Sequence, residues 1–262
     1  MKANNILLCL LTVLGLSSCG SEFWMANRFV AQAEKVQVAV YFPEEARVSL
    51  VEDSEGEYSR VLDSVDTDLF LDIMYEAYAD GLRTYGVDVY IPETPENIQV
   101  DSVHWLVMLS QVEMQGLFTD YVDYLFDFTD EYNYTFTLNT VNVASWYDIN
   151  DGEWCPTLFD EFNLRDDFSS RVTTSRANGT QYHYNITPLK ATDVYDFAVY
   201  LGRRHAAFTF DYMMNRQVAK EMRAKKGGGS PRYKLRWDPS QGSFFFQTDE
   251  EGFIELKAED ED

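Results

Sequence analysis

The sequence predicts an α+β fold in which an antiparallel or mixed sheet carries two main helices on one face, with a small β meander at the C-terminus. Two segments repeat apolar residues about every four positions, as amphipathic helices do. Several others alternate apolar and polar residues, as half-buried strands do. Together these segments follow the order β-α-β-β-β-α.

The first three predicted elements lie before residue 92. Residues 35–43 (KVQVAVYFP) alternate valines with polar residues and predict a strand. Residues 66–85 carry apolar side chains on one side and begin with aspartates, which suit a helix N-terminus. Gly86 follows as a natural stop, so this segment predicts a helix. Residues 87–91 (VDVYI) predict a short strand.

A long hairpin is predicted next. Residues 103–128 are strand-like throughout, with Gly116 as the expected site of a bulge or bend. Residues 134–147 alternate again. A turn at 130–133 would pair these two strands antiparallel.

The signal weakens over residues 148–189, which are rich in Asp, Asn, Ser and Thr. We expect a loop-rich insertion here, with one short helix at 156–163 and one short strand at 181–186. Residues 193–225 then predict the second main helix, because their apolar side chains share one side and basic residues crowd the last turns.

The predicted core domain therefore spans residues 36–226. A glycine-rich linker follows at 227–232, then a β-rich appendix at 233–257 with three short strand-like pieces. Residues 258–262 form an acidic tail. The 40 aromatic residues (18 Phe, 17 Tyr and 5 Trp) can fill a substantial core.

The N-terminus predicts secretion. Lys2 precedes an apolar run over residues 6–16, which is too short to span a bilayer and is typical of a signal peptide. The motif Leu16-Ser17-Ser18-Cys19 resembles the bacterial lipobox. This resemblance implies that residues 1–18 are removed and that Cys19 carries several acyl chains. The alternative is an ordinary signal peptide with a chance cysteine.

A lipidated Cys19 would leave residues 19–35 as a short tether. Phe23 and Trp24 could then lie at the level of the lipid headgroups. The element order of residues 36–226 resembles the α+β lipoproteins of Gram-negative envelopes, including lipopolysaccharide-assembly and transport-auxiliary lipoproteins. The 148–189 insertion and the C-terminal β segment depart from that pattern. Gly20 favours the outer membrane under the enterobacterial sorting rule.

Charge is distributed unevenly along the chain. The net charge is −23, but residues 203–236 hold ten Lys and Arg against two acids, a local +8. This balance argues against nucleic acid, which demands a broad basic face. The basic segment is either a contact for anionic lipid or an acidic protein partner, or a solvated helix end followed by a basic strand. The candidate contact residues are Arg216, Lys220, Arg223, Lys225, Lys226, Arg232, Lys234 and Arg236.

We predict no catalytic residue, no metal site and no cofactor. The three histidines lack metal-ligand spacing, and the nucleophile and phosphate-binding motifs are missing. Cys155 has acidic neighbours in the sequence, which disfavour a reactive thiolate. A hydrolase that works through two carboxylates remains the third hypothesis, because close acid pairs are abundant.

Two further patterns concern the surface. Aromatic clusters at 146–147, 154, 182–184 and 244–246 are either core or a surface for a glycan or a partner chain. Two Asp-Ser-Val triplets resemble the O-glycosylation acceptor of Bacteroidetes, with Ser64 and Ser102 as the acceptors.

The function expected from these observations is a lipid-anchored envelope protein, a non-catalytic accessory or scaffold subunit of an outer-membrane assembly or transport machine. We expect it to face the periplasm and to bind a protein partner. The alternative is a glycan-binding lipoprotein at the cell surface.

Overall fold

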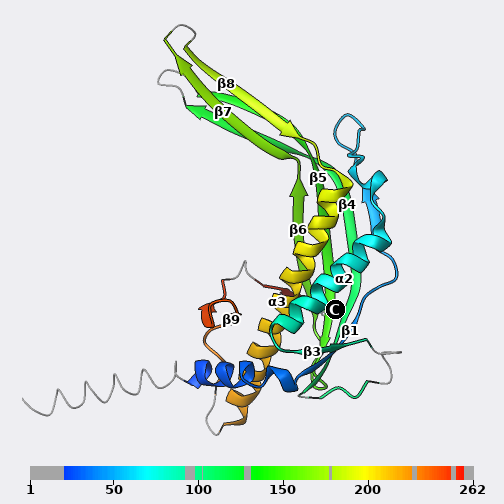
Figure 1. Cartoon of the computed structure of the whole chain (residues 1–262), viewed down its shortest axis with the longest axis vertical. Helices are drawn as coiled ribbons and strands as arrows, with labels where there is room; N and C mark the ends of the chain where they lie inside the picture. The colour runs from blue at the N-terminus through cyan, green and yellow to red at the C-terminus, as the bar shows by residue number, and fades with distance from the viewer. Residues whose placement is uncertain are drawn as a thin grey trace, which may run out of the picture.

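The computed structural model (Figure 1) describes residues 21–91, 98–101, 103–126, 131–176, 179–225, 229–248 and 252–256, of which 124–126 and 131–133 by their backbone alone. A tall twisted sheet stands behind two helices, α2 (Thr67–Thr84) and α3 (Ala191–Ala224). Two strand pairs project together at one end as an arm, and an N-terminal helix (residues 21–30) lies at the opposite end. The predicted α+β class is confirmed.

Seven of the described strands form one mixed sheet in the order β11-β6-β5-β4-β1-β3, with β2 pairing with β4 beyond β1. The β1–β3, β1–β4 and β2–β4 pairs are parallel, whereas the β4–β5, β5–β6 and β6–β11 pairs are antiparallel. The main-sheet strands are β1 (Gln37–Tyr41), β2 (Arg47–Leu50), β3 (Asp88–Tyr90), β4 (His104–Phe126), β5 (Glu131–Asn150), β6 (Thr157–Arg165) and β11 (Ile254–Leu256). Two separate hairpins join β7 (Asp167–Ser175) to β8 (Gly179–Thr187) and β9 (Leu235–Asp238) to β10 (Ser243–Phe246).

Both main helices pack on the same face of the sheet. Tyr147 of β5 shows this, because its ring stacks on Tyr78 of α2 at 5.9 Å and its hydroxyl bonds His205 of α3. Asp66 caps α2, since its carboxylate accepts from the backbone N–H groups of Asp68 and Leu69. The predicted helix start is therefore confirmed.

The long hairpin is also confirmed, with two differences in detail. The register shift in β4 lies between Leu109 and Gln111, not at Gly116. Gly116 instead meets the segment after β2, where a Cβ would lie 3.2 Å from the carbonyl oxygen of Ser59. The antiparallel pairing already includes Glu131, Tyr132 and Asn133, so the turn predicted at 130–133 is wrong for these three residues. Residue 130 lies outside the described residues.

The expected loop-rich insertion at 148–189 is wrong, because β6, β7 and β8 occupy most of it. The short helix expected at 156–163 is strand β6. Its inward positions include Leu158 and Asp160, and a charge at an inward position breaks the apolar alternation that identifies a strand. The partners that balance Asp160 come from α3, more than 40 residues later.

The arm combines two hairpins. The outer halves of β4 and β5 extend beyond β2 and β6, and β7–β8 packs against them through aromatic rings. Phe168 of β7 lies 4.7 Å from Tyr121 and 4.9 Å from Phe136, and Tyr184 of β8 lies 4.7 Å from Phe136. The 23 residues of β4 span roughly 75 Å at ~3.3 Å per residue, so the arm reaches well beyond the helices.

The C-terminal segment does not stand apart as an appendix. The hairpin β9–β10 packs on α3, where Leu235 is buried in the main core. The third strand, β11, joins the edge of the main sheet beside β6. The predicted meander therefore closes the core domain instead of following it.

Candidate functional site

Three segments that are distant in sequence meet at the end of the molecule opposite the arm. They are the N-terminal helix 21–30, the C-terminal half of α3 and the β9–β10 hairpin (Figure 1). Phe23 contacts Phe244 and Phe246 edge-on at 6.0 and 5.9 Å, and Phe29 contacts Phe210 of α3 at 5.6 Å. The described part of the expected 19–35 tether is thus a docked helix, because Met25, Ala26 and Phe29 are apolar and share its inner side.

The outer side of this N-terminal helix exposes a tryptophan between cations. Trp24 is 57% exposed, with the Arg28 guanidinium 5.0 Å and the Lys225 ammonium 6.0 Å from its ring. Arg28 also pairs with Glu221 of α3. Phe23 is turned toward the hairpin, so of the two aromatic residues expected at the headgroups, Trp24 is the one that faces outward.

Seven of the eight basic residues predicted as contacts are described, and these seven divide into two groups. Three have carboxylate partners within the chain: Arg216 and Lys220 contact Asp151 at 2.7 and 3.0 Å, and Arg236 lies 3.6 Å from Asp211. Lys226 lies outside the described residues. The remaining four are exposed and have no carboxylate partner in the part of the chain that is described: Arg223, Lys225, Arg232 and Lys234.

The two acids in these ion pairs have opposite pKa shifts. Burial alone would raise the pKa of Asp151, but hydrogen bonds from Arg216, Lys220 and two backbone N–H groups lower it to about 2. Burial raises the pKa of Asp211 to about 7, which its bonds to the Trp237 N–H and Arg236 only partly offset. Asp151 therefore ties α3 to the β5–β6 loop as a carboxylate, and Asp211 holds β9 against α3.

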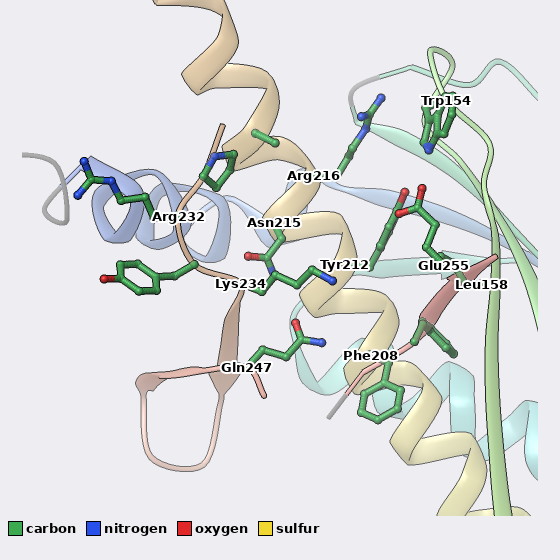
Figure 2. Close-up of a pocket in the computed structure, with 14 residues that line it drawn as sticks. Trp154, Leu158, Phe208, Tyr212, Asn215, Arg216, Arg232, Lys234, Gln247 and Glu255 are labelled. Atoms are coloured by element: carbon green, nitrogen blue, oxygen red, sulfur yellow. The ribbon is translucent and has the colours of Figure 1, made fainter. Parts of the chain in front are cut away.

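A pocket of about 560 Å³ opens between α3, the segment before β9, strand β11 and the β5–β6 loop. Figure 2 shows α3 passing behind it, with Arg232 and Lys234 on one side and Trp154, Tyr212 and Glu255 on the other. The volume falls within the range of small-molecule sites. Aromatic faces beside three cations (Arg216, Arg232 and Lys234) and one carboxylate could bind an amphiphile or a sugar.

The polar chain beneath this pocket has the connectivity of a catalytic relay but lacks access. The Tyr147 hydroxyl bonds Nδ1 of His205 at 2.9 Å, and Nε2 of His205 bonds Asp160 at 3.0 Å. Burial lowers the pKa of His205 and raises that of Tyr147, so both remain neutral beside the Asp160 carboxylate. Neither Tyr147 nor His205 is more than 1% exposed, so the chain joins α3 to the sheet and offers no reacting atom to a substrate.

The other candidate sites can be placed plainly. Cys155 lies at the surface. Its partial burial raises the pKa of its thiol, and the negative charges of Asp148 and Asp151 raise this pKa further. Within the described ranges, no group of three or more His, Cys, Asp or Glu residues could hold a metal ion. Ser64 is exposed at the end of the short 3₁₀ helix η2 (Val61–Ser64). Leu16, Ser17, Ser18, Cys19 and Ser102 lie outside the described residues.

Most predicted aromatic clusters are packed within the protein. Trp146 lies 5.0 Å from Phe159 on the sheet face away from the helices, Tyr184 belongs to the arm, and Phe244 lies 4.7 Å from Trp237. The exceptions are Trp154, which is 50% exposed beside the pocket, and Phe245 and Phe246, which are 44% and 56% exposed. The sequence did not predict this pocket, because the residues that line it come from four separate segments.

No model of a known protein family matches the chain, and no curated protein matches it in sequence. Among the described helices, none combines the length and the apolar character needed to cross a bilayer. The geometry of the site therefore carries the functional argument.

Proposed function

We propose that this chain is a lipid-anchored envelope protein, a non-catalytic accessory or scaffold subunit of an outer-membrane assembly or transport machine. The observation that carries the proposal is that the two ends of the molecule differ. The N-terminal helix, described from residue 21, is packed at one end, and the aromatic-filled arm projects from the other (Figure 1). An anchor at Cys19 would leave the arm free to reach a partner.

The anchoring step can be tested directly. Wild-type chain and a Cys19→Ser variant are expressed in a Gram-negative host with a clickable palmitate analogue, and the envelopes are fractionated. We expect label and outer-membrane residence for the wild type and neither for the variant. Equal labelling of the two chains would contradict anchoring at Cys19.

The subunit role needs a separate experiment. A pull-down from detergent-solubilised envelopes should recover at least one further envelope protein, and this recovery should fall when the aromatic packing of the arm is loosened by Phe168→Ala. Recovery of this chain alone would count against a subunit role. Protease treatment of intact cells should leave a periplasm-facing chain uncut.

A glycan-binding lipoprotein is the second candidate, favoured by the exposed ring of Trp154, which lines the pocket together with Tyr212 and Tyr233. Sugars stack on such faces through their apolar C–H surface. A glycan array with wild type and Trp154→Ala separates the two functions, since only a glycan-binding protein would give signals that the variant loses.

A further inference from the structure

We infer that the end of the molecule formed by Trp24, Lys225 and Arg232 is a docking surface for an anionic bilayer. We refer to these three residues as the basic face. The inference rests on the proposed function in taking the occupant to be the membrane that holds Cys19. It adds a binding site made of folded protein, independent of the lipid.

The first argument is the geometry of the N-terminal helix. Its inner side is buried against α3 and the core, whereas Trp24 on the outer side is 57% exposed. Lys225 lies over the Trp24 ring, and the Arg232 backbone N–H donates to Glu22 at 3.1 Å. An exposed tryptophan beside cations matches the polarity of a membrane interface, where the ring lies at headgroup level.

The second argument is charge complementarity. The cations of the basic face have no carboxylate partner among the described residues. Of the acids near them, Glu221 pairs with Arg28, and Glu22 is buried, where one of its oxygens accepts from the Arg232 backbone N–H. Glu255 lies across the pocket from Arg232. The whole chain carries −23, so an anionic surface would repel most of it. If this end of the molecule faces the bilayer, the basic face is attracted to the anionic lipids. The rest of the acidic chain then lies farther from the membrane, where it is repelled less.

The third argument is the position of the anchor. The described helix begins at residue 21, and two extended residues reach only about 7 Å. Cys19 is therefore covalently confined to the neighbourhood of the basic face. Acyl chains alone leave the orientation of a protein at the membrane open, and a basic patch beside them would fix that orientation on an anionic bilayer. In this orientation the arm points away from the membrane.

The test uses the mature chain from residue 19 with Cys19→Ser, so that no lipid contributes. Its binding to vesicles of phosphatidylcholine, with or without about one third phosphatidylglycerol, is measured by co-flotation. We expect binding to the anionic vesicles only, with loss in about 1 M salt, where the Debye length is about 3 Å.

Two variants of this chain locate the surface. Lys225→Glu/Arg232→Glu should weaken binding at least roughly twentyfold, since each basic residue at an anionic surface contributes roughly fivefold. Trp24→Ala should also weaken vesicle binding, but it should leave the salt dependence of binding unchanged, because it removes no charge. All three side chains are exposed, and the Arg232 contact to Glu22 uses the backbone, so the fold should persist, as circular dichroism can check.

The matched control is Arg47→Glu/Arg171→Glu, which reverses two exposed arginines on β2 and β7 with the same change in net charge. It should bind as the unmodified chain does. Equal loss in both double variants, or no binding to anionic vesicles at low salt, would overturn the inference. Either result would leave acylation of Cys19, measured by palmitate labelling, unaffected.

Discussion

Replacing Gly81 by alanine adds a methyl group where α2 and α3 touch. A Cβ on Gly81 would lie 2.6 Å from the Cβ of Ala206, whereas two carbon atoms in contact prefer about 3.5–4.0 Å. On the other side of the same crossing, a Cβ on Gly202 would lie 2.4 Å from the Met74 carbonyl oxygen. The helices therefore cannot relax without moving away from each other along the whole contact.

Two effects of Gly81→Ala on the free energy of unfolding oppose each other. Alanine is about 1 kcal/mol better than glycine inside a helix. Overpacking a tight core contact costs about 1–3 kcal/mol, and the short separation places this contact at the upper end. Gly81→Ala should thus lower the free energy of unfolding by about 2 kcal/mol. Ala206→Gly should cost a similar ~2 kcal/mol, from ~1 of helix propensity and ~0.8 for the buried methyl.

The exchange Gly81→Ala/Ala206→Gly should restore most of the loss. It returns one methyl group to the interface and cancels the propensity terms, so we expect unfolding within about 1 kcal/mol of wild type. Simple additivity would give a loss of about 4 kcal/mol, and urea unfolding at unchanged m-value measures the difference. A double variant as unstable as that sum would refute the packing argument.

Three further predictions follow from single residues. Because burial raises the pKa of Asp211 to about 7, the folded chain binds this proton more tightly than the unfolded chain does. The stabilisation is complete below about pH 4, and between about pH 4 and pH 7 the wild type should lose up to about 4 kcal/mol relative to Asp211→Asn; parallel pH–stability curves would contradict this. Asp66→Ala should cost about 1 kcal/mol of stability by uncapping α2, whereas exposed Asp72→Ala should not. Phe168→Ala should speed amide hydrogen exchange in β7 and β8 without changing that of β1, and uniform acceleration would show that the arm is not a separate unit.

Sequence patterns located the elements whose information is local. The helix around Met74 and the strand around Val38 show their period within one segment, and Asp66 signals its own cap. Strand β6 was not predicted, because its inward-facing Asp160 is balanced by Arg204 and His205, which belong to a helix distant in the sequence.

The sequence by itself determined the α+β class, the two main helices, the long hairpin and the concentration of positive charge near the C-terminus. These follow from periodicity and composition, which act over a few residues at a time. Only the tertiary structure decided that the segment after Cys19 docks as a helix beside Lys225, and that Arg216, Lys220 and Arg236 are balanced within the chain. The physical reason is that a charge acquires its role from what lies within a few ångströms of it, and folding brings those neighbours together from segments up to 210 residues apart.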